Sequence, residues 1–228
     1  NPAFPKEEYE RMRSKLPPWL FNMRYRGRFE KPIGMVYDSF NEAHCKVKRF
    51  PIPSNWLVYV GHDFGMANEA VVFYAQNPGS GDYFLFQTYK PGPGRSTRQH
   101  IEQWKEIIKG MQVIRRAGGS HQEDLIRQGY TAQGWPIQEP YVTNVQEGIM
   151  RVYALHKSNR IYVFDDLYDY LDEKMSYSWR LDDQYHPTDE IEDKARFHLM
   201  DAERGILGSL PRETKTDSRP ISKRTNIF

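Results

Sequence analysis

The chain has 228 residues and a formal net charge of +2, and its single cysteine is Cys45. This length is enough for one substantial domain with extensions or for two small domains. One cysteine excludes an internal disulfide framework and a zinc site of clustered cysteines. No apolar run is long enough to span a bilayer and no signal peptide opens the sequence, so we expect a soluble protein of a reducing compartment. The phosphate-binding motif Gly-x-x-x-x-Gly-Lys-Ser/Thr is absent from the sequence.

The first 50 residues predict a linker or approach segment that packs on a main fold. Pro5–Lys15 indicates a short helix with a proline in its first turn, and Tyr25–Phe29 and Gly34–Phe40 indicate short extended pieces. Three apolar, β-branched and aromatic runs then predict strands near residues 56–63, 70–76 and 82–89. Because turn residues separate the second run from the third, the strands are expected to form an antiparallel meander.

The segments after the meander predict a helical crossover to a parallel strand. Ser96–Gly110 carries apolar residues at helical spacing, and residues 111–114 follow as a short strand parallel to the first. A second helix is expected from about Asp124. The later expected elements are an edge strand at 135–137, a helix at 145–155, a strand at 161–164, a helix at 167–179, a lead-in at 187–193 and a last helix near 194–206.

This order of elements predicts an α/β fold with a mixed central sheet flanked by helices. We assign the main domain to residues 51–208, because the apolar periodicity begins and ends there. Residues 209–228 are polar and charged, and they predict a flexible basic tail.

Carboxylates at the ends of these elements are the first candidates for chemistry. Asp63 follows an apolar strand directly, and it is either a site residue at the edge of the sheet or a turn-forming aspartate that caps the next loop. Glu69 comes a few residues later and is expected to be a solvated residue at a strand end. Two-metal phosphodiester cleavage requires several carboxylates aimed at divalent ions. Asp63 is therefore a candidate metal ligand only if other carboxylates lie close to it.

The last predicted helix offers such partners. His198 and Asp201 lie three positions apart and therefore on one helical face. Together with Asp63 they are suited to bind a metal and to position water or phosphate, although a buried histidine bonded to a surface aspartate is the commoner role for an isolated pair. The crossover strand ends in Gly118–Gly119, where a further acid is expected. Glu123 comes soon after, either as that acid or as an ordinary first-turn residue.

Basic residues near these elements are candidates for DNA contact. Such contacts hold phosphates and position a duplex without reading its bases, although a solvated surface charge is the commoner role for each of these residues taken alone. The candidates are Lys46, Lys48, Arg49, Arg95 and Arg98.

Several segments in order resemble the C-terminal nuclease domain of tailed-phage terminase large subunits, the motor proteins that package DNA. The likeness runs from Asn1–Pro5 to about Arg204. The segments that carry it are Tyr25–Phe29 with Gly34–Tyr37 as a linker, Val60–Gly65 as a first acidic motif, Gln146–Val152 with Ile161–Phe164 as a helix and strand, and His198–Arg204 as a closing His-x-x-Asp-Ala-x-Arg motif.

The resemblance implies a ribonuclease H-like (RuvC-type) fold and a metal-dependent endonuclease, a hydrolase that cuts concatemeric viral DNA during genome packaging with little sequence specificity. It implies two Mg²⁺ or Mn²⁺ ions, with Asp63 and Asp201 as ligands and His198 as a ligand or a water-positioning group; Glu123 is our choice for the remaining ligand. The implied partners are double-stranded DNA, the ATPase domain of the same protein, the portal and the small terminase subunit, without a membrane, in the cytoplasm of the host cell during virion assembly.

Two departures from the family pattern leave alternatives open. Gly118–Gly119 stands where many relatives keep an aspartate, and Phe197 precedes His198 where many have another. A nuclease-like module that docks to the portal or motor, with weak or lost cleavage, is one alternative. The other is a nuclease of the Holliday-junction resolvase or transposase type.

Overall fold

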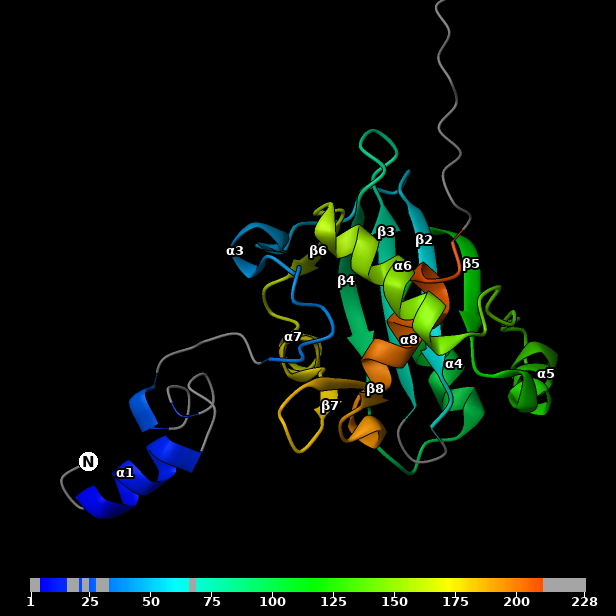
Figure 1. Ribbon diagram of the computed structural model, residues 1–228. Coiled ribbons are helices and arrows are strands. Elements are labelled where there is room, and N and C mark those ends of the chain that lie inside the picture. Colours follow the sequence, from blue (N-terminus) through cyan, green and yellow to red (C-terminus); the bar gives the residue numbers. More distant parts are fainter. Residues whose placement is uncertain (1–4, 16–20, 22–24, 28–32, 66–68, 211–228) are drawn as a thin grey trace, which may run out of the picture.

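The computed structural model describes residues 5–15, 21, 25–27, 33–65 and 69–210. Within these ranges the centre of the fold is a six-stranded mixed sheet in the order β1-β6-β4-β3-β2-β5 (Figure 1). Its strands are β1 (Lys46–Val47), β2 (Leu57–Asp63), β3 (Ala70–Gln76), β4 (Tyr83–Tyr89), β5 (Gln112–Gly118) and β6 (Ile161–Phe164). A separate hairpin consists of β7 (Trp179–Leu181) and β8 (Pro187–Ile191).

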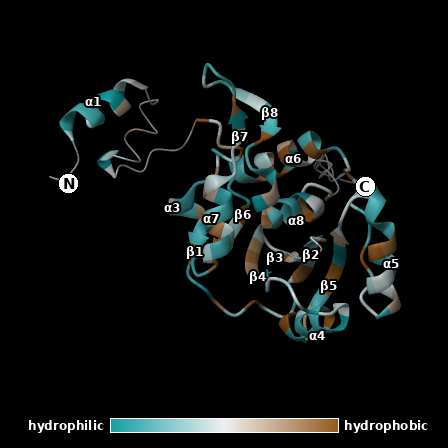
Figure 2. Cartoon of the chain, turned by 90° about the horizontal axis from the view of Figure 1, so that it is seen from below, coloured by the Kyte–Doolittle hydropathy of each residue, from teal (hydrophilic) through white to brown (hydrophobic). Residues whose placement is uncertain are grey.

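Helices cover both faces of this sheet. The helices of the described ranges are α1 (Lys6–Lys15), α3 (Glu42–Cys45), α4 (Thr97–Ile107), α5 (Asp124–Ala132), α6 (Val145–Lys157), α7 (Tyr168–Ser176) and α8 (His198–Leu207), with 3₁₀ turns η1 (His121–Glu123) and η2 (Lys194–Arg196). Of these, α1 lies apart from the sheet (Figure 1). Figure 2 shows α8 and α6 on one side of the strands and α4 on the other. The strands are buried between these layers, which explains why β3 is apolar on both faces.

The register of the meander brings three strand ends together. β2 runs antiparallel to β3, with Asp63 opposite Ala70, and β3 runs antiparallel to β4, with Val71 opposite Tyr89. The end of β2, the start of β3 and the end of β4 therefore meet at one end of the sheet. We call this end, marked by Asp63, Ala70 and Tyr89, the rim.

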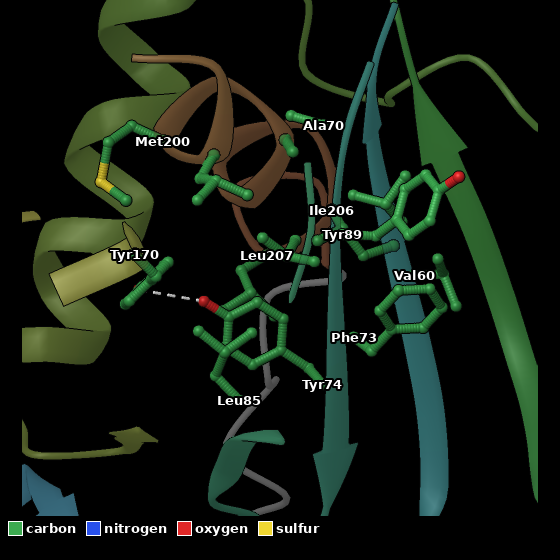
Figure 3. Packing of buried hydrophobic residues seen from close by; sticks show 14 of the residues in the cluster. Val60, Ala70, Phe73, Tyr74, Leu85, Tyr89, Tyr170, Met200, Ile206 and Leu207 are labelled. Atoms are coloured by element: carbon green, nitrogen blue, oxygen red, sulfur yellow. Dashed lines mark hydrogen bonds between the residues drawn. The ribbon is translucent and has the colours of Figure 1, made fainter. Parts of the chain in front are cut away.

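The core lies between α8 and the sheet. Ile206 and Leu207 of α8 lie in this layer with Tyr74 of β3 (Figure 3), and all three are nearly or fully buried. Tyr74 and Tyr170 join their hydroxyl groups across this layer at 3.1 Å. Because buried hydroxyls need partners, this hydrogen bond fixes how α7 approaches the sheet.

The expected meander and crossover are confirmed. The three strands lie at 57–63, 70–76 and 83–89, and β5 runs parallel to β2 as expected, although it extends to Gly118. The helix after the meander begins as predicted, because Ser96 accepts the backbone N–H of Gln99 and Gln99 bonds back to Ser96.

Several smaller predictions are wrong. Residues 135–137 are not a strand: Pro136 has no N–H to donate, and only Gln138 bridges to Ala117. Helix α7 ends at Ser176, and Trp179 instead opens β7, where its N–H donates to Gly34 O at 2.7 Å.

Residues 187–191 form strand β8 instead of leading into a helix, and α8 starts only at His198. Residues 34–40 are mostly turns, with Phe40 N bonded to Tyr37 O, instead of an extended piece. Within the predicted extended piece at 25–29, the described residues are 25–27, and residues 25 and 26 are helical instead. The predicted tail at 209–228 lies outside the described residues except for 209 and 210. No helix in the described part of the chain is long and apolar enough to cross a membrane.

Candidate active site

Asp63 and His198 meet at the rim. Asp63 is the last residue of β2 and His198 the first of α8, and His198 Nδ1 lies 2.7 Å from Asp63 Oδ2. Their side chains keep 27% and 20% of their exposure, so the pair is accessible from solvent. The contact joins two elements that are 135 residues apart in the chain.

Gly61 explains how α8 comes so close to β2. A Cβ at this position would lie 2.2 Å from Ala202 O and 2.6 Å from Ile206 Cγ2. Only glycine leaves room for the helix backbone to rest on the strand. The sequence Gly61-His-Asp63 therefore places the carboxylate and provides the space for the helix that carries its partner.

Electrostatics connect three of the predicted carboxylates. Burial raises the pKa of Asp63, the charges of Asp201 and Glu123 raise it further, and the hydrogen bond from His198 lowers it. The same hydrogen bond raises the pKa of His198, against the effect of burial and of the nearby Lys90 charge. Asp63, Asp201 and Glu123 thus share one electrostatic environment, which favours a cation.

Asp201 lies one turn beyond His198 and is held by Arg204. Arg204 Nη2 and Nε lie 2.9 and 3.2 Å from the same oxygen, Asp201 Oδ1. Both side chains are mostly buried, with 17% exposure each. Arg204 reaches this position beside α6, where Gly148 leaves room for its chain: a Cβ there would lie 2.8 Å from Arg204 Cγ.

The crossover strand ends in two glycines for a steric reason. A Cβ at Gly118 would lie 2.2 Å from His62 O, and one at Gly119 would lie 2.5 Å from the Phe64 ring. An aspartate at either position cannot be accommodated without moving β5 away from β2. Glu123 is the next acid, and its Oε2 accepts the Ser120 N–H at 2.6 Å and the Ser120 hydroxyl at 2.9 Å.

Glu69 is not the solvated residue that we expected. It is 7% exposed, and the Tyr130 hydroxyl donates to its Oε2 at 2.9 Å. Burial raises its pKa to about 7, and the charges of Asp63 and Glu123 act in the same direction. The prediction failed because Glu69, directly before β3, contacts Tyr130 of α5, a packing that strand periodicity does not reveal.

Two further residues reach the start of α8 and were missed by the sequence analysis. Glu173 of α7 is 3% exposed, and its Oε2 accepts the N–H of Leu199 at 2.8 Å. Its Oε1 accepts Lys90 Nζ at 2.7 Å, and Lys90 follows β4 directly at the rim. Helix α8 has no side-chain cap of its own at Phe197, so Glu173 supplies that cap from another helix. No local motif signals such a contact between distant elements.

The donor chemistry suits a hard divalent cation. Asp63, Asp201 and Glu123 offer carboxylate oxygens, the ligands that Mg²⁺ and Mn²⁺ prefer, and the repulsion that raises the Asp63 pKa is what a bound cation would relieve. As their side chains are placed, no three His, Cys, Asp or Glu residues of the described ranges converge as a complete metal cluster. Asp63 and His198 are in contact, whereas Asp201 and Glu123 are engaged by Arg204 and Ser120.

Most of the predicted DNA-contacting residues are paired with acids. Lys46 pairs with Glu42, Lys48 with Asp165, Arg49 with Asp166, and Arg98 with Glu102. Arg95 differs, because its described contacts are the hydroxyl at 3.4 Å and the ring of Tyr89. Their role on DNA stays a prediction, and the geometry ranks Arg95 first because it lies on the loop next to the rim.

A pocket of about 320 Å³ opens beside the rim. Its walls include Phe64, Glu69, Arg95, His100 and Tyr130. A larger apolar pocket of about 510 Å³, lined by Phe50, Phe86 and Phe164 among others, shares none of these residues. The polar, smaller pocket is the one that adjoins the candidate site.

Comparison with known proteins gives matches in structure alone. No protein-family model and no curated protein matches the sequence. A large terminase from a thermophilic bacteriophage, in complex with ADP, has 17% identity and a TM-score of 0.67 over 92% of this chain and 53% of that chain. The P22 large terminase nuclease domain has 17% identity and a TM-score of 0.60 over 77% of this chain and 91% of that chain.

A third structure is the large terminase nuclease of thermophilic phage G20c with bound magnesium. It has 14% identity and a TM-score of 0.56 over 77% of this chain and 97% of that chain. The chain has the terminase nuclease fold. The expected ribonuclease H-like class is thereby confirmed. This chain spans about half the length of the ADP-bound large terminase and most of the length of the isolated terminase nuclease domains.

Proposed function

We propose that this chain is the nuclease part of a phage large terminase and hydrolyses phosphodiester bonds of double-stranded DNA with Mg²⁺ or Mn²⁺. The observation that carries the proposal is the contact of Asp63 with His198 at the rim, with Asp201 one helical turn further on. The terminase nuclease fold supports it, and so do the G20c nuclease structures with bound magnesium and bound cobalt.

In this proposal Asp63 and Asp201 hold a pair of divalent ions, and Glu123 turns from Ser120 to join them. When bound, the ions lower the pKa of the attacking water and stabilise the leaving oxygen. His198 orients the Asp63 carboxylate through the 2.7 Å hydrogen bond. Arg204 holds Asp201 in the same way, so each acid has one partner that fixes its rotamer.

Phosphate contacts place the duplex at the rim. Arg95 lies on the loop after β4 and is exposed there. Because contacts to phosphates carry no base information, we expect cleavage with little sequence specificity. The substrate in this proposal is concatemeric viral DNA, cut during packaging in the cytoplasm of the host cell. The partners are the ATPase domain of the same protein, the portal and the small terminase subunit.

Cleavage of supercoiled plasmid in Mn²⁺, Mg²⁺ or EDTA tests the proposal. Asp63→Asn and Asp201→Asn keep the size of the side chain and remove its charge, and we expect each to lower the rate by about 100-fold or more. Asp183→Asn, on the exposed β7–β8 turn, is the matched control and should cut at the wild-type rate. If the folded wild type does not cut with any of these ions, the proposal fails and a docking module becomes the better interpretation.

A further inference from the structure

We propose that Lys90 binds a DNA phosphate next to the scissile bond and that Glu173 positions both Lys90 and the start of α8. This inference deepens the proposed nuclease function and rests on it. It assigns a substrate-binding cation of the site, a role for which the candidates from the sequence were Lys46, Lys48, Arg49, Arg95 and Arg98.

The first argument is place. Lys90 comes directly after Tyr89, which lies opposite Val71 on the strand rung next to Asp63 and Ala70. Its side chain is 29% exposed, so Lys90 is partly open to solvent at the rim although its Nζ contacts the buried Glu173. A phosphate that approaches Asp63 therefore passes within reach of Lys90.

The second argument is a series of contacts from Lys90 to Asp63, made of three hydrogen bonds and the peptide bond between His198 and Leu199. Lys90 Nζ donates to Glu173 Oε1 at 2.7 Å, and Glu173 Oε2 accepts the N–H of Leu199 at 2.8 Å. Leu199 is adjacent to His198, whose Nδ1 lies 2.7 Å from Asp63 Oδ2. Lys90 is thus tied to the same helix end that carries the candidate catalytic groups.

The third argument concerns charge. Asp63, Glu69, Glu123 and Asp201 gather around the rim, and DNA phosphates are repelled by such a surface unless cations face them. The Lys90 ammonium has three N–H donors, of which Glu173 takes one. Glu173 also accepts the N–H of Leu199 at the start of α8, because the N-terminal end of a helix needs acceptors for its free N–H groups. Lys90 can therefore add a phosphate without giving up Glu173.

Lys90 would make the same contact with Glu173 if its role were only an ordinary salt bridge. A measurement of DNA binding distinguishes this structural role from a phosphate contact. We would measure the affinity for a duplex of about 20 base pairs by fluorescence anisotropy in EDTA, between about 50 and 200 mM salt. Each phosphate contact contributes about 0.9 to the slope of log K against log salt, so Lys90→Met should lower the slope by about that amount, and Lys90→Arg should keep it.

A matched lysine controls for charge alone. Lys109 follows α4 shortly before β5, at the end of the sheet opposite to the rim, and its side chain is 75% exposed. Lys109→Met should leave the slope at the wild-type value. In plasmid cleavage, Lys90→Met should lose at least about tenfold in rate at saturating DNA, and Lys90→Arg should recover most of that loss.

As a positioning residue, Glu173 should affect the cleavage rate without changing the salt dependence of DNA binding. Glu173→Gln keeps an oxygen for the Leu199 N–H but loses the charge that holds Lys90. It should reduce the cleavage rate while the salt slope stays that of the wild type. Because Lys90→Met leaves the buried Glu173 without its cation, the double variant Lys90→Met/Glu173→Gln gives a second, folded measurement of the slope.

The outcomes keep this inference apart from the proposed function. A wild-type salt slope in both Lys90→Met and the double variant, together with normal cutting, overturns the role of Lys90. A reduced slope with a wild type that never cuts supports Lys90 as a phosphate contact and rejects the nuclease. A reduced slope with lowered cutting, reversed by Lys90→Arg, supports both.

Discussion

Glu69 is a carboxylate that the fold holds away from water. Its Oε2 accepts from Tyr130, and its Oε1 has no hydrogen-bond partner among the described residues. Burial lowers the pKa of His62 to about 3, so this imidazole is neutral. The Trp135 indole donates to His62 Nε2 at 3.2 Å, which puts the His62 proton on Nδ1, 3.9 Å from Glu69 Oε1. The ring therefore faces Glu69 with its N–H.

The raised pKa of Glu69 makes stability depend on pH. Its folded pKa is about 7 against an ordinary value of 4.5, so the folded state binds the proton more tightly than the unfolded state. This contribution is fully present below about pH 4.5 and is lost as the pH rises through about 7. Glu69→Gln should match the wild type near pH 5 and be more stable by about 1–3 kcal/mol near pH 8.

Urea denaturation at both pH values measures this difference. Glu102→Gln, at an exposed position on α4, is the control and should show no such pH dependence. An effect of Glu69→Gln that is equal at both pH values would mean that Glu69 is ionised in the folded protein throughout this range.

At the residue scale, the sequence predicts Asp63 and His198 of the candidate site better than the residues that surround this pair. Asp63 and His198 each lie in a recognisable local motif, and the structure places them in contact. Glu173 and Lys90 come from α7 and the end of β4, and nothing in their local sequence predicts that they meet at α8. Contacts of this kind depend on tertiary packing, to which periodicity is blind.

At the scale of elements, the seating of α8 on β2 determines the site. Gly61→Ala would force a Cβ to within 2.2 Å of Ala202 O, so helix and strand must separate. We expect a loss of about 3 kcal/mol or more in the free energy of unfolding, together with reduced cleavage. Gly129→Ala is the matched control, because its Cβ meets nothing within 4 Å on the exposed helix α5. It should stabilise the fold by about 0.5–1 kcal/mol.

Thermal unfolding of Gly61→Ala and Gly129→Ala tests whether α8 rests on β2 at Gly61. Equal melting temperatures for Gly61→Ala and the wild type would show that α8 is not seated on β2 as described.

A buried charged cluster joins α8 to α6 and α7. Glu203 accepts Lys174 Nζ and the hydroxyls of Tyr74 and Tyr170, and Lys174 also contacts His156 Nε2 at 2.9 Å. Burial alone would raise the pKa of Glu203. The charges and hydrogen bonds of Lys174 and His156 outweigh burial and lower this pKa to about 2. Its stabilising effect is therefore present above about pH 4.5 and is lost as the pH falls toward 2.

Removing one partner of this pair leaves the other charge buried and unpaired. Glu203→Gln should cost about 3–5 kcal/mol in the free energy of unfolding near pH 7. The double variant Glu203→Met/Lys174→Met removes both charges and should recover most of this loss. Denaturant unfolding of the single and double variants measures the coupling; additive losses would show that the two groups do not interact in the folded protein.

For the whole molecule, strong periodicity predicted the architecture and weak periodicity misplaced its periphery. The strands β2 to β4 and helix α4 come from long apolar patterns, and the short parallel strand β5 was predicted from its place after the crossover helix; all were found near the expected residues. The strands of the hairpin β7–β8 contain no buried residue, and three of their residues, Arg180, Asp189 and Glu190, are charged and exposed. The sequence of these strands therefore shows no apolar face. The two strands pair with each other, and backbone contacts of residues 178–179 with residues 34–35 join this end of the hairpin to the rest of the fold.

The distribution of the core also indicates which part of the chain folds as a unit. The main apolar cluster runs from Val36 to Leu207, with Leu210 packed against it. Tyr9, Phe21 and Tyr25 contact one another, with ring centroids 5.0 to 6.3 Å apart. In Figure 1, α1 lies apart from the sheet. The described residues before 33 are therefore absent from the apolar cluster that supports the rim, whereas residues 36–50 take part in it.

A chain limited to residues 33–210 should thus keep the fold and the site. Because it retains the whole main cluster and every residue placed at the rim, we expect its melting temperature to fall by no more than a few degrees, which corresponds to a loss of about 1 kcal/mol. Plasmid cleavage should stay within about threefold of the full chain, since Asp63, Asp201 and His198 are all kept. A chain of 33–210 that does not unfold cooperatively would show that residues before 33 or after 210 are part of the folding unit. A folded one that fails to cut would place a necessary DNA contact in those removed segments, where basic residues such as Arg24 and Lys223 are found.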